Sequence, residues 1–386
     1  MTTTEVPPYA SVVVIGGGVI GLSTAFHLAA AGVPDVVVVE ASELGAGSTS
    51  KAAGGVRAQF SDAVNIKLAQ RSLLAYERFH LDHDQDIDFR RTGYLFLLER
   101  PHDVTSFAAS QDIQHQFGVP SRIIEPAEAQ QLSPLVDTNG LLAAAWSPDD
   151  GHCTPESVVL GYSRSARRNG ARILTGCEVT GIAVDHGQVR QVRTSLGSIR
   201  TDAIVCAAGA WSGQVSALAG VSLPVTPLRR QIVTTGPIDG LDPGLPMTID
   251  FSTGLYFHPE GQGLLIGLSD PDETPGFKVS RSDGWLPRLA EAIDRRIPSV
   301  SDAGLASGWA GLFEQTPDHN GLIGKSAQVG GFFYATGFSG HGFMLAPAVG
   351  EVMRDLYLEQ SPKIEISALD AARFDGSQIQ PELVVF

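Results

Sequence analysis

A chain of 386 residues is too long for most single hydrophobic cores, so we expect two domains. Hydrophobic residues make up 43% of the sequence and charged residues 18%, which is typical of a globular protein with a large core. The net charge of −15 argues against nucleic acid and against an anionic membrane surface as partners.

The cysteines and the N-terminal residues indicate the cellular compartment and bear on whether a metal site or a membrane span is expected. Cys153, Cys177 and Cys206 have no metal-ligand spacing, and their odd number favours reduced thiols in the cytoplasm. The N-terminal residues MTTTEVPPYA lack the cationic region and cleavage site of a signal peptide. Glycines interrupt the apolar stretch at 11–31, so it does not predict a membrane span. We therefore expect a cytoplasmic protein without a metal site or a membrane-spanning segment.

The stretch 11–40 has the pattern of a strand, a glycine-rich turn, a helix and a second strand. Gly16 suits the tight turn, Gly18 lets backbone approach a pyrophosphate, and Gly21 lets the helix pack on the sheet. Phosphates are expected at the helix N-terminus, where free N–H groups favour negative charge. Glu40 ends the second strand, where an acidic residue accepts hydrogen bonds from a ribose hydroxyl. A purely structural βαβ unit would not explain these glycines, so the stretch predicts dinucleotide binding.

Two kinds of pattern alternate along the rest of the chain. Residues 41–60 are rich in small residues and predict a loop that can lie against a ligand. Helical spacing predicts helices at 62–80, 103–117, 154–170 and 346–360. Buried strands are expected at 203–208 and 332–336, and many short strands within 86–146, 171–211 and 221–305.

These shifts predict an α/β fold combined with an α+β fold. The nucleotide-binding domain is expected to be discontinuous, over 8–85, 147–220 and 306–386. A strand-rich second domain is expected to interrupt it twice, over 86–146 and 221–305.

Several motifs, read together, resemble the FAD-dependent D-amino-acid-oxidase superfamily, in its sarcosine oxidase, glycine oxidase and proline dehydrogenase β-subunit branch. They are GGGVIGLSTAFHLAAAG, GSTSKAAGGVR, TDAIVCAAGAW, TPDHNGLIG, ATGFSGHGFMLAPAVGE and ISALDAARF, in that order along nearly the whole chain. The resemblance implies a Rossmann-type FAD-binding domain and a mixed-sheet substrate domain inserted twice. It also implies oxidation of a small secondary or N-methyl amino acid by hydride transfer to the flavin, giving an imine.

The resemblance also assigns cofactor-binding positions residue by residue. The glycine-rich turn and Glu40 would hold the pyrophosphate and the ribose, Ser48 and Thr49 would add donors, and Val179 would read the adenine edge. The segment 52–55 would lie beside the isoalloxazine ring, and backbone N–H groups of 340–344 would meet its ribityl and pyrimidine side. The full expected set is Gly16, Gly18, Val19, Ile20, Gly21, Glu40, Ala41, Ser48, Thr49, Ser50, Ala53, Gly54, Gly55, Val179, Ala208, Gly209, Trp211, Gly340, His341, Gly342, Phe343 and Met344.

Arg57 is the residue expected to grip the substrate. It falls where sarcosine oxidases carry an arginine on the substrate carboxylate, and a guanidinium suits that bidentate contact. The alternative is a surface arginine in a rim salt bridge. His341 is expected at the flavin, or else hydrogen-bonded to backbone. Tyr256 and His258 alternate along one strand and share a side, which faces either the pocket or the exterior.

Three positions depart from the sarcosine oxidase pattern. Met344 stands where those enzymes carry a second carboxylate-binding lysine, and Leu265 lies near where they carry a lysine that assists oxygen attack. Gly311 occupies the position of the cysteine that links FAD covalently, so FAD is expected to be non-covalent. The loss of charge at 265 favours a dehydrogenase that passes electrons to a redox partner over an oxidase that uses oxygen.

Three other readings stay open at this point. One is an FAD-dependent 2-hydroxy-acid dehydrogenase of the L-2-hydroxyglutarate type, because a fold does not decide chemistry. Another is a β-subunit that is active only in a hetero-oligomer, since homo- and hetero-oligomers are both possible. The last is an NAD-dependent enzyme, because Glu40 would suit either nucleotide.

Overall fold

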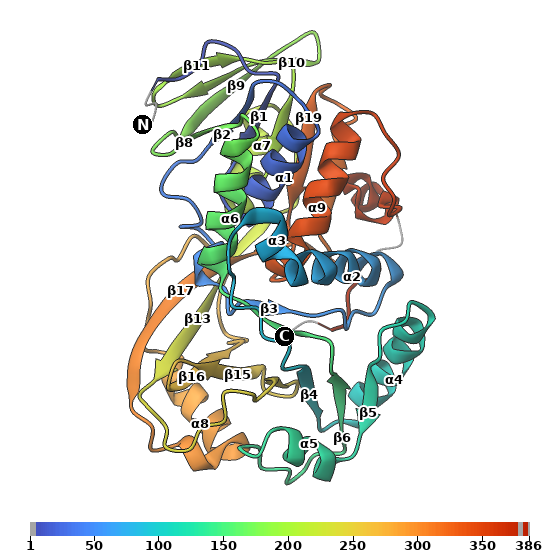
Figure 1. Ribbon diagram of the computed structural model, residues 1–386, viewed down its shortest axis with the longest axis vertical. Coiled ribbons are helices and arrows are strands. Elements are labelled where there is room, and N and C mark those ends of the chain that lie inside the picture. The colour runs from blue at the N-terminus through green and yellow to red at the C-terminus, as the bar shows by residue number, and fades with distance from the viewer. Residues whose placement is uncertain (1–4, 377–380, 385–386) are drawn as a thin grey trace.

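The computed structural model describes residues 5–376 and 381–384 and places the glycine-rich turn directly after an inner strand of a six-stranded sheet. This sheet forms the core of the upper half of the molecule in Figure 1. Its strands, in spatial order, are β18 (Leu322–Lys325), β19 (Phe332–Thr336), β12 (Ile204–Cys206), β1 (Val12–Ile15), β2 (Val36–Val39) and β8 (Arg172–Leu174). All neighbours run parallel except β18, which is antiparallel to β19.

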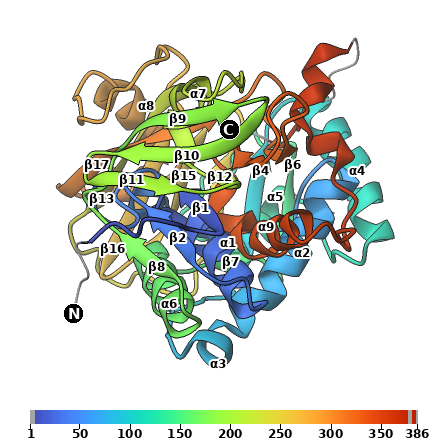
Figure 2. The same ribbon diagram turned by 90° about the horizontal axis from the view of Figure 1, so that it is seen from above.

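Two different layers cover the six-stranded sheet, which explains why β1 and β2 are apolar along their whole length. On one face lie the helices α1 (Val19–Ala30), α2 (Ala63–Glu77), α3 (Phe79–His83), α6 (Pro155–Arg168) and α9 (Gly342–Tyr357). On the other lies a three-stranded antiparallel sheet of β9 (Val179–Asp185), β10 (Gln188–Thr194) and β11 (Gly197–Arg200). Figure 2 shows this order of layers from above.

An eight-stranded mixed sheet forms the lower half of Figure 1. Its spatial order is β17 (Leu305–Gln315), β13 (Thr226–Thr235), β16 (Gly263–Leu268), β15 (Leu255–Glu260), β14 (Met247–Asp250), β4 (Tyr94–Leu98), β6 (Ala143–Ser147) and β5 (Arg122–Ile124). Only the β14–β4 pair is parallel within these described strands. Helices α5 (Pro126–Leu132) and α8 (Leu286–Arg296) pack on one face, and α4 (Pro101–Gln116) packs on the other.

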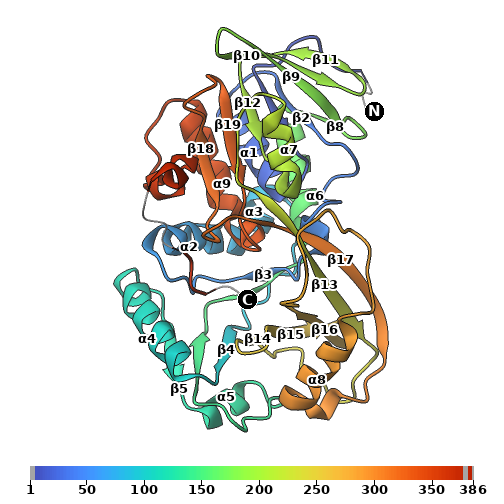
Figure 3. The same ribbon diagram turned by 180° about the vertical axis from the view of Figure 1, so that it is seen from behind.

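A long ribbon of two strands connects the two halves. β13 and β17 pair over nearly their full length, from Thr226 opposite Gln315 to Thr235 opposite Leu305. Figure 3 shows this ribbon rising from the eight-stranded sheet toward the Rossmann-type half. β3 (Gly55–Val56) pairs with β7 (Gly151–His152) in a separate two-stranded sheet, and α7 (Ser212–Ala217) precedes β13 along the chain.

Most expected elements are present, and the differences have local causes. The helices expected at 62–80, 103–117 and 154–170 are α2, α4 and α6; α2 and α6 are shorter than expected, whereas α4 begins earlier, at Pro101. α8 was not expected, because it lies within a region whose other segments have strand patterns. α9 begins at Gly342 rather than near residue 346, because glycine and proline there obscure the helical pattern.

The two strand-rich segments share one sheet, since β4–β6 and β13–β17 all belong to the eight-stranded sheet. β17 belongs to it as well, although the expected boundary at 305/306 gave its residues to the nucleotide-binding domain. The strand pattern of 305–315 alone does not show that it pairs with the distant β13. The double insertion and the domain limits stay a prediction.

Candidate functional site

A cavity of about 760 Å³ lies between the glycine-rich turn and the eight-stranded sheet. Twenty of the residues expected from the sequence line it: Gly16, Gly18, Val19, Ile20, Glu40, Ala41, Ser48, Thr49, Ala53, Gly54, Gly55, Val179, Ala208, Gly209, Trp211, Tyr256, Gly340, Gly342, Phe343 and Met344. Gly21, Ser50, Arg57, His258 and His341 were expected at the site and are not among its lining residues.

Backbone crowding explains the glycines at the nucleotide end. Gly16 has φ +117°, and a Cβ there would lie 2.3 Å from the carbonyl oxygen of Ala207. A Cβ on Gly21 would lie 2.0 Å from the carbonyl oxygen of Gly16, so this glycine acts through packing. A Cβ on Gly18 would meet only Thr49 Oγ1 within 4 Å, at 3.2 Å, and would otherwise enter the cavity. The turn therefore leaves room for a group beside Gly18.

Two polar side chains fix the geometry of this turn. Glu40 accepts hydrogen bonds from the Gly17 N–H at 2.7 Å and from the Ser42 N–H at 2.8 Å, one at each carboxylate oxygen. Each oxygen keeps a further lone pair for a ribose hydroxyl. Thr49 Oγ1 accepts from the Val19 N–H at 3.1 Å, at the start of α1.

The opposite end of the cavity is also built from small residues and a helix start. Gly54 has φ +75°, and a Cβ on Gly55 would lie 1.9 Å from the Tyr94 hydroxyl oxygen. α9 begins at Gly342, and the N–H groups of its first turn have no partner within the helix. This end can therefore offer backbone donors to an anionic or electron-rich group.

Glu314 is a lining residue that sequence reasoning missed. Its carboxylate accepts a hydrogen bond from Thr336 Oγ1 at 2.8 Å, and burial raises its pKa. It lies between Gly209 and Gly342, since Cβ atoms on these glycines would be 3.7 Å and 3.4 Å from its carboxylate oxygens. The sequence signal that could have indicated this residue is an acidic side chain that follows Phe313 and shortly precedes the TPD sequence.

Arg57 is buried in the protein and does not line the cavity. Its side chain is fully buried, and its guanidinium lies 4.4 Å from the centre of the Phe60 ring. It donates to the carbonyl oxygens of Gln59 and Val384, the latter at 2.7 Å. Its Nη2 also lies 3.1 Å from Nε2 of His341. Burial lowers the pKa of His341 well below its usual value, and the charge of Arg57 lowers it further, so the neutral ring accepts this bond.

Tyr256 and His258 lie on the same strand with different surroundings. Tyr256 lines the cavity and its ring covers Gly267, where a Cβ would lie 2.1 Å from the ring carbon Cζ. His258 is 2% exposed, and its ring stacks on that of His152 with centroids 4.3 Å apart. Its Nε2 lies 3.0 Å from the carbonyl oxygen of Ala53, so it supports the loop that lines the cavity.

The family model described as FAD-dependent oxidoreductase, DAO, matches residues 11–356 of the chain. The chain belongs to the DAO family of FAD-dependent oxidoreductases. It is 32% identical to mouse dimethylglycine dehydrogenase over 95% of the chain, but it spans only 44% of that protein's length. Among solved structures, L-proline dehydrogenase from P. horikoshii is 34% identical, with a TM-score of 0.90 over 96% of this chain and 99% of that one. Glycine oxidase from Geobacillus kaustophilus is 25% identical, with a TM-score of 0.85 over 95% and 99%.

FAD is the cofactor of this DAO-family chain, and the cavity residues fit it. The cavity joins the Gly16–Gly18 turn and Glu40, which suit a pyrophosphate and a ribose, to the start of α9, which suits an electron-rich ring. The residues that would hold FAD are therefore those of the expected set that line the cavity.

The three departures from the sarcosine oxidase pattern lie in different places in this DAO-family chain. Met344 and Gly311 line the cavity, and a Cβ on Gly311 would lie 2.6 Å from the Cβ of Lys51. Leu265 is 4% exposed on β16, opposite His258, and does not line the cavity.

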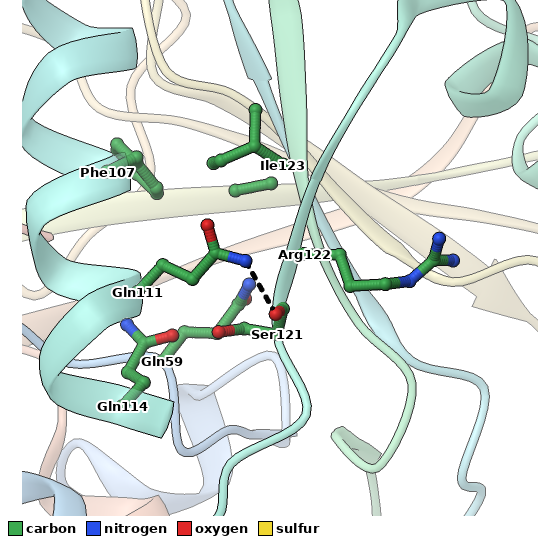
Figure 4. Close-up of a pocket in the computed structure, with 8 residues that line it drawn as sticks. Gln59, Phe107, Gln111, Gln114, Ser121, Arg122 and Ile123 are labelled. Atoms are coloured by element: carbon green, nitrogen blue, oxygen red, sulfur yellow. Dashed lines mark hydrogen bonds between the residues drawn. The ribbon is translucent and has the colours of Figure 1, made fainter. Parts of the chain in front are cut away.

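A second, much smaller cavity of about 10 Å³ lies between α4 and β5 (Figure 4). Glutamines surround it, and Gln111 Nε2 donates to the carbonyl oxygen of Ser121 at 2.8 Å. This volume suits about one water molecule and no substrate.

The described residues contain neither a metal-binding group nor a membrane-spanning helix. No group of three or more His, Cys, Asp or Glu residues there is arranged to hold a metal ion. No helix in 5–376 or 381–384 has the length and apolar character needed to cross a membrane.

Proposed function

We propose that the chain oxidises a small secondary or N-methyl amino acid, with non-covalent FAD as its cofactor. The relatives named above act on dimethylglycine, L-proline and glycine, which are all small amino acids. The observation that carries the proposal is the lining opposite the start of α9. Tyr94, Ile232, Met247 and Tyr256 give this part a mostly apolar wall from the eight-stranded sheet.

This apolar wall has the properties that the oxidation of an amine requires of a protein. FAD, when bound, would supply the acceptor for a hydride from the carbon next to the substrate nitrogen, and a neutral secondary amine would thereby become an iminium ion, the protonated imine. Apolar side chains favour the neutral amine, because removing a charged ammonium from water is costly. They also hold the C–H bond in one orientation and exclude water.

Non-covalent attachment is supported by Gly311. Glycine offers no side-chain atom for a bond to FAD, and the stem of Lys51 fills the space beside it. Acid precipitation of the purified yellow protein should leave colourless protein and release all the flavin into solution. Flavin that stays with the pellet would contradict this part of the proposal.

A substrate panel tests the activity and the electron acceptor together. We expect turnover of sarcosine, glycine, proline, hydroxyproline or their N-methyl relatives, and faster turnover with an artificial dye than with oxygen. The dye preference is proposed because Leu265 is apolar and lies near where the sarcosine oxidases of the resemblance carry a lysine that assists oxygen attack. Faster turnover with oxygen would make the chain an oxidase.

The same panel separates the alternatives. Turnover of 2-hydroxyglutarate without amine turnover would replace the amine by a hydroxy acid. A chain that binds FAD but turns over substrate only with an added partner subunit would be a β-subunit. The purified chain acting alone on an amine would exclude both.

A further inference from the structure

The adjacent arginines of β13, Arg229 and Arg230, point to opposite sides of the eight-stranded sheet. Arg230 and Ile232 line the cavity, whereas Arg229 and Gln231 do not. Arg229 is neutralised on its own side, where its Nε lies 2.6 Å from a carboxylate oxygen of Glu273. Gln231 bonds the Ser282 N–H at 2.7 Å on that side. The two neighbouring arginines therefore differ in both direction and charge balance.

Arg230 has no ion-pair partner among the residues described. Its Nη1 makes one long hydrogen bond, 3.3 Å, to the carbonyl oxygen of Arg229, and its Nε is buried with no partner. The guanidinium carbon lies 5.2 Å from the centre of the Phe313 ring, another lining residue. A cation–π contact restrains the guanidinium without neutralising it. Because a guanidinium stays protonated in proteins, the cavity wall carries a positive charge that makes no ion pair with a described carboxylate.

We propose that Arg230 binds the carboxylate of the amino-acid substrate, with Tyr256 beside it; this rests on the proposed function. A buried charge without a partner is costly, and a ligand carboxylate would supply the missing partner. The planar guanidinium can form two parallel hydrogen bonds to a carboxylate. Arg57, the anchor expected from the resemblance, already donates to protein acceptors and does not line the cavity.

Among the described residues that line the cavity, Lys51 is the other cation. Its stem packs beside Gly311, and its carbonyl oxygen accepts a hydrogen bond from Trp309 Nε1 at 3.1 Å. It is the natural comparison for Arg230, because both carry a positive charge into the same cavity.

Steady-state kinetics of four FAD-loaded variants test the assignment. Arg230→Met should raise the KM for amino-acid substrates about a hundredfold or more, because it removes a buried charge-assisted pair. Arg230→Lys should recover part of that loss and guards against a folding defect in the methionine variant. Arg229→Met, the matched control, should change KM less than about threefold, because its side chain faces Glu273. An unchanged KM in Arg230→Met, or a larger effect from Lys51→Met, would overturn the proposal.

A binding measurement separates this proposal from the proposed function. Pyrrole-2-carboxylate and pyrrole-2-carboxamide have the same shape, but only the first is charged. Titrated into the holoprotein, the carboxylate should perturb the flavin spectrum and raise the unfolding temperature, and the carboxamide should bind at least about tenfold more weakly. Arg230→Met should abolish this preference. If it does so while no amine is oxidised, the proposed function fails and the anion site stands. If amines are oxidised and the variant keeps the preference, the anion site fails alone.

Discussion

The Arg57 guanidinium donates to the carbonyl oxygen of Val384 at 2.7 Å, so a buried cation near the start of the chain holds the segment 381–384. The same guanidinium bonds the Gln59 carbonyl oxygen and His341 Nε2. These contacts join the loop after β3 to the start of α9. Arg57 therefore ties together three segments that are far apart in sequence.

Replacing Arg57 should lower stability more than it changes substrate binding. Arg57→Met leaves three buried acceptors without their donor, so we expect the free energy of unfolding to fall by about 2–4 kcal/mol. Urea unfolding of the holoprotein measures this change, with Arg71→Met at the surface as the control. A variant of normal stability with a large increase in KM would return the carboxylate-binding role to Arg57.

Alanine substitutions at two glycines of the same turn should have different effects, one on stability and the other on FAD affinity. Gly21→Ala places a Cβ 2.0 Å from the Gly16 carbonyl oxygen, so it should destabilise the apoprotein by about 2–4 kcal/mol. Gly18→Ala has only Thr49 Oγ1 nearby, at 3.2 Å, so the apoprotein should stay within about 1 kcal/mol of normal stability. Its FAD affinity should fall about tenfold or more, because the Cβ enters the space left for phosphate. Unfolding of the apoprotein and FAD titration separate the effects; equal losses of stability would contradict this prediction.

The Tyr256 ring depends on the absence of a side chain at Gly267. Gly267→Ala would place a Cβ 2.1 Å from Tyr256 Cζ, so the ring must move. We expect KM to rise about tenfold, as in Tyr256→Ala, and the double variant to be no worse than either single one. FAD content should not change. Gly304→Ala is the control, because no atom lies within 4 Å of a Cβ there. Additive effects in the double variant would contradict the coupling.

Asp150 should make stability depend on pH. Burial raises its pKa to about 7 from an ordinary 3.8, while its Oδ1 accepts from the Ala58 N–H at 2.9 Å. Between these values the folded state holds a proton that the unfolded state has lost, so unfolding becomes easier as the pH rises. The contribution is complete below about pH 4 and is lost as the pH rises through about 7.

Comparison with Asp150→Asn isolates this term, because other titrating groups cancel. The stability of the wild type relative to the variant should fall by about 4 kcal/mol from pH 4 to pH 8, because the pKa of Asp150 rises from 3.8 to about 7 on folding. Denaturant unfolding at several pH values measures the difference. A constant difference across that range would show that Asp150 titrates normally.

Part of the fold could be predicted from the sequence, because the glycine-rich turn depends on the glycines that it contains. The stretch 11–40 contains its own reasons for turning, because Gly16 and Gly21 relieve clashes with nearby backbone. The predicted strand–turn–helix–strand is confirmed as β1, α1 and β2. The end of the strand-rich region was not readable in this way, since β17 belongs to its sheet only through pairing with the distant β13.

The sequence could not show which side chains point into the cavity, and this limited the prediction of substrate-binding residues. Arg229 and Arg230 are adjacent and identical in type, and only the pairing of β13 shows which one lines the cavity. Arg57 matched a family position, but its neighbours Phe60, His341 and Val384 come from separate segments. A motif match gives a residue's place in the chain, whereas its partners depend on the assembled fold.

The β13–β17 ribbon has a consequence for how such enzymes diverge. β17 holds the cofactor loop, because its Leu312 carbonyl oxygen accepts from Ser48 Oγ at 2.6 Å. β13 faces the cavity at Arg230 and Ile232 without bonding that loop. Under the proposed function, substitutions on β13 would therefore change which amine fits the cavity, while β17 would keep its hydrogen bond to the loop that contains Ser48.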